Sequence, residues 1–342
     1  MNKLLSRDAF RHFVFERDNN KCVICGEKAD AAHHIIERRL FSDGGYYLNN
    51  GASVCEEHHL KCEMTQISVE DVRLACGITK PVVPDQIYDD TPVDKWGNEI
   101  LASGLRLRGE LYHDESVQKI LKAGGVLDQF TNRVKYGRTF HLPWSAGIHD
   151  DDRVMTSLDR FIGQRVIVHS KWDGENTSMY NDYIHARSID GRHHPSRDWV
   201  KGLWGKIKHD IPQDWRICVE NLYAKHSIAY DNLPSYALGF SVWNERNICL
   251  PWDEAKTWLE LLGIEPCPVI YDGIYDEKII RGLYNEKTDW ETKEGYVMRI
   301  ADSFSYSEFR YCVAKYVRAR HVQTSKHWMQ GQAIEPNKLR TE

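Results

Sequence analysis

The sequence lacks three features that would place it outside the cell or in a membrane. Its 342 residues contain no apolar run of membrane-spanning length, which excludes a protein anchored by transmembrane helices. The first residues, Met1 to Ser6, lack the apolar centre of a signal peptide. The nine cysteines are an odd number and six of them are dispersed, so no disulfide framework is expected. We therefore predict a cytoplasmic protein with no membrane partner.

An excess of positive charge is also missing. The formal net charge is -5 at pH 7, which excludes a uniformly basic nucleic-acid binder and makes any phosphate contacts local. Residues 310–328 are one candidate, because they combine Arg318, Arg320 and Lys326 with aromatic side chains; a solvated basic face is the alternative. The length and the 42% hydrophobic content favour two or more globular domains.

A lysine at the end of an expected strand is the most informative feature that is present. Residues 165–171, Arg-Val-Ile-Val-His-Ser-Lys, form the short β-branched run of a strand, and Asp173-Gly174 is typical of a turn. Lys171 would therefore lie at the lip of a pocket. The tetrad Lys171-Trp-Asp-Gly174 is short enough to arise by chance in an ordinary surface turn, so its surroundings decide its meaning.

Four further apolar runs predict strands, and each has a candidate residue on it or beside it. They are residues 215–219 before Glu220, residues 236–243 with Phe240, residues 295–300 after Glu294, and residues 310–317 with Lys315. A lysine within an apolar strand is costly without an anionic partner, so Lys315 is expected to contact a phosphate or carboxylate. The alternatives are solvated strand-edge charges for the two glutamates and a core position for Phe240.

In this order the candidates resemble the motifs of the RNA ligase branch of the covalent nucleotidyltransferases, which also includes DNA ligases and mRNA capping enzymes. The resemblance covers about residues 136–330. Six motifs carry it: Lys171-Trp-Asp-Gly174, Arg187 in His-Ala-Arg-Ser, Glu220 in Val-Glu-Asn-Leu-Tyr, Phe240, Glu294-Gly-Tyr-Val-Met298, and Lys315. Many relatives have Lys-x-Lys in the last motif. Here the second position is Val317, and Arg318 or Arg320 is the candidate for the second cation.

The resemblance implies an ATP-dependent reaction in which Lys171 attacks the α-phosphorus of ATP and forms a lysyl-AMP. AMP would then pass to a 5′-phosphate end, and a 3′-hydroxyl would displace it to seal the strand. These residues are expected to form the nucleotide site: Lys171, Asp173, Gly174, Arg187, Glu220, Phe240, Glu294 and Lys315.

The resemblance also implies individual roles within that site. Glu220 would hold the ribose and Phe240 would stack on adenine. Glu294 would help to organise Mg²⁺ or Mn²⁺, and Lys315 would contact the α-phosphate. An amine is nucleophilic only when it is neutral, so we expect Lys315, Arg187 and the metal to lower the pKa of Lys171.

Two short ligand pairs near the beginning of the chain predict a zinc site. Cys22-Val-Ile-Cys25 and Cys55-Glu-Glu-His58 each place two ligands at a spacing that supplies adjacent vertices of a tetrahedron. Scattered buried thiols are the alternative interpretation.

The histidines around these pairs resemble the HNH family of ββα-metal nucleases, over about residues 7–63. By position, His34 would be the general base that activates water, and Asn50 would orient the motif. His33 and His59 would bind a catalytic divalent metal. A zinc-held module that only binds nucleic acid, RNA or DNA, or supports the rest of the chain is the alternative.

The expected fold class is α+β, in three segments. Residues 1–76 would form the small HNH-like zinc module, residues 77–135 a linker and accessory segment, and residues 136–342 a ligase-type nucleotidyltransferase domain of antiparallel sheets flanked by helices. We predict an ATP-dependent RNA ligase that seals 5′-phosphate and 3′-hydroxyl ends in RNA repair, with a broken tRNA or a nicked duplex as candidate substrates. A DNA ligase or guanylyltransferase, or an HNH nuclease or nucleic-acid-binding protein with an inert ligase-like half, are the alternatives.

Overall fold

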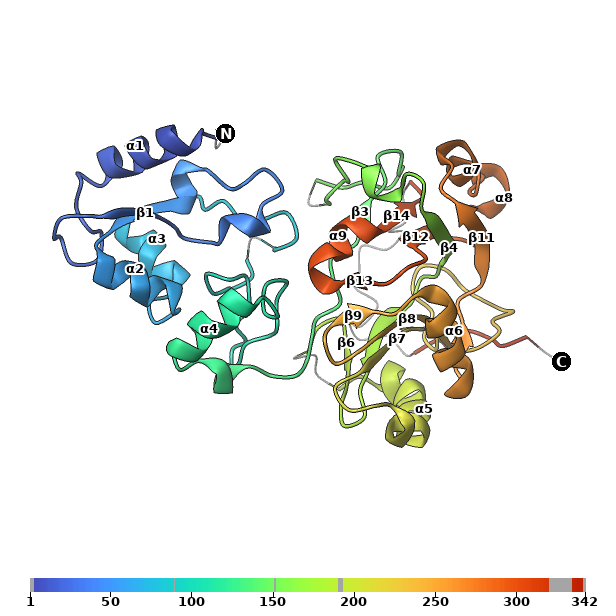
Figure 1. Ribbon diagram of the computed structural model, residues 1–342. Coiled ribbons are helices and arrows are strands. Elements are labelled where there is room, and N and C mark those ends of the chain that lie inside the picture. The colour runs from blue at the N-terminus through green and yellow to red at the C-terminus, as the bar shows by residue number, and fades with distance from the viewer. Residues whose placement is uncertain (1–2, 89, 151, 190–192, 320–333, 341–342) are drawn as a thin grey trace. The chain divides into compact units, whose positions relative to one another are not determined.

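The computed structural model describes residues 3–88, 90–150, 152–189, 193–319 and 334–340. The chain divides into two compact units, Met1–Val134 and Lys135–Glu342. Both contain helices and strands, and the fold class is α+β (Figure 1). In these described ranges, no helix has the length and apolar character needed to cross a membrane.

The first unit is built on a two-stranded antiparallel sheet. Its strands are β1 (Ala31–His34) and β2 (Gly51–Val54), and its α-helices are α1 (Arg7–Arg17), α2 (Glu56–Glu63), α3 (Val69–Ala75) and α4 (Glu115–Ala123). The Ser6 side chain caps α1 by accepting a hydrogen bond from the Ala9 amide. Helix α1 buries Phe10 and Val14, and α2 follows β2 directly through Cys55. The order β1, β2, α2 places the histidine-rich segment and both predicted ligand pairs around one small core.

Residues 77–134 belong to this first unit. Ile87 and Val93 are buried in the same core as the two strands, and Trp96 forms a second small core with Val117 and Leu121 of α4. The proline-containing segment, expected to be an extended linker, is therefore packed against the first sheet. Its apolar side chains account for this, because burying them removes apolar surface from water.

The second unit contains two larger sheets. Its strands are β3 (Phe140–His141), β4 (Arg165–Lys171), β5 (Glu175–Met179), β6 (Ile184–Ala186), β7 (Arg216–Asn221), β8 (Ala237–Trp243), β9 (Ile248–Cys249), β10 (Glu265–Pro266), β11 (Val269–Ile274), β12 (Gly295–Ile300), β13 (Phe304–Ser305) and β14 (Val313–Val317). Its α-helices are α5 (Asp198–Ile207), α6 (Trp252–Leu261), α7 (Glu277–Arg281), α8 (Glu286–Asp289) and α9 (Phe309–Cys312).

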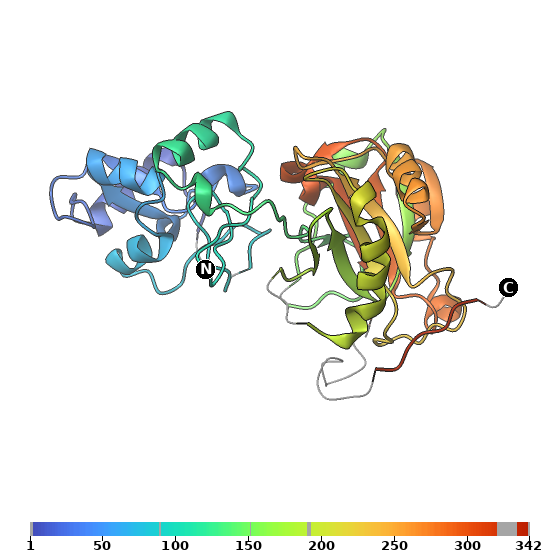
Figure 2. The same cartoon turned by 90° about the horizontal axis from the view of Figure 1, so that it is seen from below.

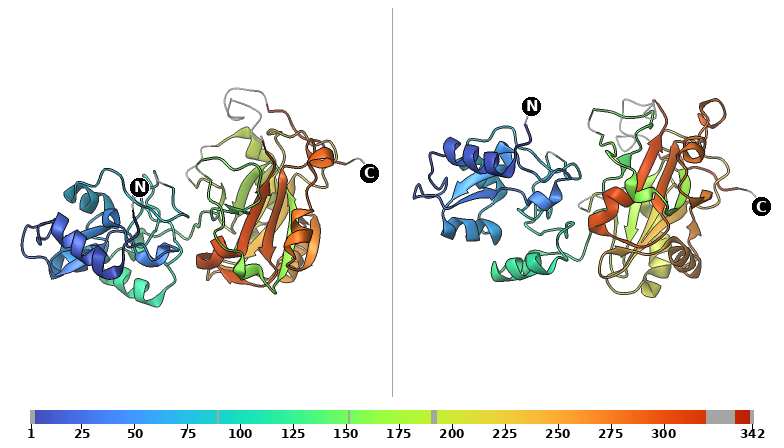
Figure 3. Two further views of the ribbon diagram at one scale, coloured as in Figure 1. Left: turned by 90° about the horizontal axis from the view of Figure 1, so that it is seen from above. Right: turned by 45° about the horizontal axis from the view of Figure 1, so that its top comes forward.

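The strands pair mostly in antiparallel fashion. The seven-stranded sheet has the order β13-β9-β8-β7-β5-β6, with β10 beside β8, and the five-stranded sheet has the order β11-β4-β12-β14-β3. The strands of the second sheet run side by side in Figure 3. Only β3 with β14 and β10 with β8 are parallel among the described strand pairs.

Alternation along the strands produces two cores in this unit. On β7, Cys218 belongs to the core shared with the five-stranded sheet, whereas Ile217 and Val219 belong to the core under α5 and α6. Period-two alternation of this kind is what a strand covered on both faces requires. The helices α5 and α6 thus cover the outer face of the seven-stranded sheet (Figure 2). Glu220, two residues after Cys218 on β7, lies on the inner face.

The structure corrects one predicted boundary. Residues 310–317 are not one strand, because α9 occupies Phe309–Cys312 and β14 begins at Val313. The expected basic string from Arg320 to Trp328 lies outside the described residues.

Candidate nucleotide site and metal clusters

Lys171 is the last residue of β4 and lies opposite the start of β12. Gly295 is its cross-strand partner, so Glu294 directly precedes the paired position. The Lys171 Nζ donates to Glu294 Oε2 at 2.5 Å, and the Glu294 side chain is only 9% exposed. The register of two neighbouring strands therefore brings together residues that are 123 positions apart in the sequence.

Glu220 reaches the same place from the seven-stranded sheet. It pairs with Asn176 across β5 and β7, and its Oε1 accepts a hydrogen bond from the Gly174 amide at 3.2 Å. A Cβ atom on Gly174 would lie 2.6 Å from the Asn221 carbonyl oxygen and 2.7 Å from Leu222. Only glycine fits at this position, so Gly174 allows the turn after Lys171 to lie close to β7.

The Asp173 carboxylate holds the loop that contains Ser227 and Ile228. Its Oδ2 accepts hydrogen bonds from the Ser227 amide at 2.7 Å and hydroxyl at 2.5 Å, and from the Ile228 amide at 2.9 Å. The Asp173 amide donates to the Tyr230 hydroxyl at 2.9 Å. The Asn337 side chain accepts from the Tyr230 amide and donates to the Leu222 carbonyl. Tyr230 and Asn337 were not expected from the sequence, since neither belongs to a recognisable motif.

The carboxylates around Lys171 raise its pKa, contrary to the expectation that its surroundings would lower it. Burial opposes the charge, but the attraction of Glu294, Glu220 and Asp173 outweighs burial. Burial raises the pKa of Glu220 to about 8, and Glu294 and Asp173 add to this shift by repulsion. The physical reason for the difference is the number of acidic groups beside Lys171, which the motif spacing does not reveal.

Lys315 lies on β14, next to β12, with its partner carboxylate on a different segment. Its Nζ is 3.7 Å from Asp152 Oδ1, and His141 Nε2 lies 3.2 Å from the same oxygen. Burial lowers the pKa of Lys315 to about 8, with Asp152 opposing the shift and Lys171 and Arg187 contributing to it. Lys171 and Arg187 therefore lower the pKa of Lys315, whereas Lys315 and Arg187 were expected to lower the pKa of Lys171. Arg187 itself is exposed, just after β6.

Phe240 occupies a β-bulge of β8. The pairing with β7 passes from Ser241 opposite Cys218 to Gly239 opposite Val219, which leaves Phe240 as the extra residue. A bulge re-aims a side chain, and here it directs the ring into the core between the sheets. The ring is 8% exposed, with Tyr136 at 5.4 Å and His169 at 6.5 Å between centroids.

Of the two candidates for the second cation of the last motif, the structure describes Arg318. Val317 is buried in the core, and Arg318 is also buried, with its guanidinium 4.3 Å from the centre of the Trp290 ring. Arg320 lies outside the described residues. A cavity of about 340 Å³ opens beside the tetrad and is lined by Lys171, Trp172, Tyr230 and Lys293, among others.

In the first unit, the four predicted zinc ligands converge. Cys22, Cys25, Cys55 and His58 present ligand atoms that all lie within 4.8 Å of one another. Cys25 Sγ is 3.8 Å from Cys55 Sγ, and Cys22 Sγ is 3.7 Å from His58 Nδ1. Zinc–sulfur bonds of about 2.3 Å place two sulfurs of a tetrahedron roughly 3.8 Å apart, so this donor set fits zinc.

His33 and His59 converge on a residue that was not expected. His33 Nδ1 and His59 Nε2 each lie 3.4 Å from Glu63 Oε1, and these three side chains form a second group with metal-ligand spacing. His59 and Glu63 are four residues apart on α2, which puts them on one face of the helix. That spacing is the sequence signal that could have identified Glu63.

A buried lysine contacts the same group. Lys95 is 4% exposed, and its Nζ lies 3.1 Å from Glu63 Oε1 and donates to the His34 carbonyl at 2.9 Å. Burial, with a further contribution from Lys95, lowers the pKa of His33 to about 3 and that of His34 to about 4. His34 is therefore neutral near pH 7, as a general base must be.

Asn50 fixes the loop between β1 and β2. Its side chain accepts from the Ile36 amide at 2.9 Å and donates to the Ile36 and Gly45 carbonyls. The His34 ring stacks on Phe10 at 4.5 Å. Together these contacts fix the loop after β1 and the His34 ring, which follows His33 directly in the sequence.

Comparison with known proteins gives one family match. Residues 164–317 match the RNA ligase family, which is under half of the chain. No curated protein matches the sequence.

Similar solved structures include three ligases. A protein from Aquifex aeolicus described as a putative ATP-dependent DNA ligase has 18% identity, covering 69% of this chain and 55% of that chain, with a TM-score of 0.38. An RNA ligase of Naegleria gruberi solved with ATP and Mn has 13% identity, covering 55% and 56%, with a TM-score of 0.37. An archaeal ATP-dependent RNA ligase has 19% identity, covering 48% and 45%, with a TM-score of 0.33. The chain spans about half the length of each.

The family match covers β4 to β14 and includes Lys171, Glu220, Glu294 and Lys315. This part of the chain is therefore similar to the RNA ligase family.

Proposed function

We propose that the protein is an ATP-dependent RNA ligase that seals 5′-phosphate and 3′-hydroxyl ends through an AMP adduct on Lys171. One observation carries the proposal: the ends of β4, β7 and β12 bring Lys171, Glu220 and Glu294 together, with Lys315 on the adjacent β14. A lysine among residues that can hold a nucleotide and its phosphates is the arrangement that adenylation requires.

Three displacements at phosphorus make up the reaction. The neutral Lys171 amine attacks the α-phosphorus of ATP; a P–N bond forms, the bond to the leaving pyrophosphate breaks, and the amine releases a proton. The 5′-phosphate of an RNA end then attacks the same phosphorus and frees Lys171. A 3′-hydroxyl finally attacks the activated 5′-phosphate, joins the strand and releases AMP. Lys315 and Arg187 would stabilise the phosphate charge in these steps.

The residues present fit Mg²⁺ or Mn²⁺ through a carboxylate. Glu294 is buried and offers the hard oxygen ligands that these ions prefer. A divalent cation held there would supply positive charge that counteracts the carboxylates which raise the pKa of Lys171. Glu220 would accept hydrogen bonds from the ribose, and Phe240 would present its ring to the adenine.

A sealing assay tests the substrate class. Nicked duplexes with an RNA or a DNA 3′-hydroxyl strand, single-stranded RNA and a broken anticodon loop would be incubated with ATP or GTP and Mg²⁺. Sealing of RNA ends with ATP, and its loss in Lys171→Ala, supports the proposal and a role in RNA repair. Sealing of DNA nicks alone would favour a DNA ligase. Transfer of GMP to an added RNA with a 5′-diphosphate end would favour a guanylyltransferase.

We further propose a zinc-held HNH-like module in the first unit, with nuclease activity as a second candidate function. The two histidines and Glu63 favour this candidate, because two imidazoles and a carboxylate suit a divalent transition metal beside the neutral His34. A module that only binds RNA or DNA is the alternative.

Nicking of plasmid DNA and of RNA with Mn²⁺ would decide between these two roles. Cleavage by the wild type, lost in His34→Ala but kept in the exposed control His12→Ala, supports a nuclease. Equal background cleavage by all three proteins would leave a binding module.

A further inference from the structure

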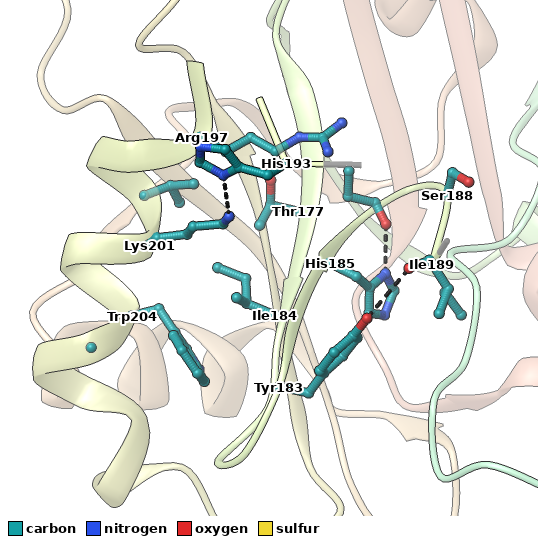
Figure 4. A pocket seen from close by; sticks show the side chains of 13 residues that line it. Thr177, Tyr183, Ile184, His185, Ser188, Ile189, His193, Arg197, Lys201 and Trp204 are labelled. Atoms are coloured by element: carbon teal, nitrogen blue, oxygen red, sulfur yellow. Dashed lines mark hydrogen bonds between the residues drawn. The ribbon is translucent and has the colours of Figure 1, made fainter. Parts of the chain in front are cut away.

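A cavity on the outer face of the seven-stranded sheet has no part in the adenylation site. It has a volume of about 490 Å³ and lies between β5, β6 and α5 (Figure 4). Thr177 lines it and pairs across the sheet with Val219, whereas Glu220 pairs with Asn176. Successive strand residues point to opposite faces, so this cavity and Glu220 lie on opposite faces of the sheet. ATP that reacts at Lys171 would therefore leave the cavity unfilled.

Two aromatic rings in the cavity wall are held in fixed positions. The Trp204 indole donates to the Tyr180 carbonyl at 2.6 Å, and the Tyr183 hydroxyl donates to the Ile189 carbonyl at 3.4 Å. Ile184 and Val200 add apolar surface between them. Lys208 Nζ lies 5.1 Å from the centre of the Trp204 ring. Both rings line the cavity, and a nucleobase of any sequence stacks well on such rings.

The polar part of the wall includes two basic side chains. Lys201 and Arg197 line it together with His193, and no aspartate or glutamate does so among the described lining residues. Figure 4 shows Lys201 directed at His193, with 2.9 Å between Nζ and Nδ1. Arg197 binds Glu175 with both ends of its guanidinium, and Glu175 directly follows the tetrad. The Arg197 charge is thus paired with the strand that leaves the tetrad, and the ammonium of Lys201 suits a phosphate.

A glycine in α5 keeps the cavity open. Glycine in a helix interior is less stable than alanine, yet α5 contains Gly202 and Gly205. A Cβ atom at either position would meet no atom within 4 Å, so packing does not require glycine there. Gly205 lines the cavity and Gly202 does not. A Cβ atom at position 205 would therefore lie in open space at the cavity wall, from which a longer side chain can extend.

We propose that this cavity binds one nucleotide of the RNA strand, with its base against Trp204 and Tyr183 and its phosphate near Lys201. The inference rests on the proposed ligase function. The strand β6 forms the edge of its sheet, so an RNA chain whose end lies at Lys171 can pass around that edge, beside the exposed Arg187, and reach the outer face. The site would add affinity for the strand without contacting the reacting atoms.

The test fills the cavity in the full-length protein with Gly205→Leu and uses Gly202→Leu as the matched control. Affinity for a 5′-phosphorylated RNA, thermal unfolding and AMP-adduct formation would be measured for both. Both changes favour the helix, so neither is expected to lower the unfolding temperature. Gly205→Leu should weaken RNA binding about tenfold, as the loss of one stacked base does, and keep the adduct. Gly202→Leu should match the wild type.

Equal RNA affinity of the two variants would overturn the proposal and leave the cavity to a different class of ligand. Trp204→Ala provides a second check, because it removes the stacking ring instead of filling the space. It should also weaken RNA binding without loss of the adduct. A wild type that forms no AMP adduct would refute the ligase function instead. The RNA affinities of the variants would still show whether the cavity binds RNA.

Discussion

Lys171 and Lys315 carry the same side chain, yet their pKa values move in opposite directions. Three carboxylates outweigh burial at Lys171 and raise its pKa, while burial dominates at Lys315 and lowers its pKa to about 8. Lysine is charged below its pKa and neutral above it. The attraction of Lys315 for phosphate is therefore present below about pH 8 and is lost as the pH rises through that value.

This difference predicts a pH dependence of ATP binding. Between about pH 7 and pH 9, the KM for ATP in AMP-adduct formation should rise several-fold in the wild type, because Lys315 loses its charge. In Lys315→Arg the KM should stay nearly constant, since arginine keeps its charge over this range. The exposed Lys256, paired with Glu260 on α6, provides the control Lys256→Arg, which should follow the wild type. The same rise in Lys315→Arg would show that Lys315 does not hold the phosphate.

The charge of Lys95 leads to a prediction about metal binding in the first unit. Its ammonium lies 3.1 Å from the Glu63 oxygen that faces both His33 and His59. A divalent cation and this ammonium repel each other and compete for Glu63. Lys95→Met should therefore bind Mn²⁺ about tenfold more tightly than the wild type, as measured by titration of the zinc-loaded protein.

Two variants control this measurement. Lys61→Met removes a lysine of α2, the helix that carries Glu63, and this lysine pairs with Glu57. The variant should bind Mn²⁺ as the wild type does. Glu63→Gln removes the shared carboxylate and should weaken Mn²⁺ binding. Unchanged or weaker binding by Lys95→Met, in a variant that unfolds at the wild-type temperature, would contradict the competition.

At the scale of helices and strands, the apolar pattern located most elements but not their local irregularities. The β-branched run of residues 165–171 predicted β4 with the bounds that the structure has. The short helix α9 was read as part of a strand, because one helical turn has too few residues to establish a period of 3.6. The bulge at Phe240 depends on the pairing of β8 with β7, which the sequence of either strand alone does not specify.

The two ligand pairs before and after β1 and β2 predict a zinc-dependent fold of the first unit. Metal analysis should find one zinc per chain in the wild type and in Cys76→Ala, whose thiol lies outside the cluster. Cys55→Ala should lose the zinc. A chelator should lower the unfolding temperature of the wild type, because ligand binding to the folded state supplies folding free energy. Full zinc content in Cys55→Ala would refute the site.

At the scale of the whole molecule, the predicted residues meet within each unit. Lys171, Glu220, Glu294 and Lys315 converge in the second unit. In the first unit the four zinc ligands form one group, and His33 and His59 join Glu63 in another. The motifs indicated which residues to consider. The partners that hold them, such as Asp152, Lys95 and Asn337, come from distant segments with no motif of their own, and only the folded chain identifies them.

The central claim is that Lys171 becomes covalently linked to AMP, and its most direct test is to map that adduct. The protein would be incubated with ATP and Mg²⁺ and digested. The peptides would then be examined by mass spectrometry after only a short exposure to low pH. We predict one AMP on the peptide that contains Lys171, none in Lys171→Ala, and an unchanged adduct in Lys256→Ala, which changes an exposed lysine of α6. An adduct on Lys293 or another lysine, or an active preparation without any adduct, would contradict it.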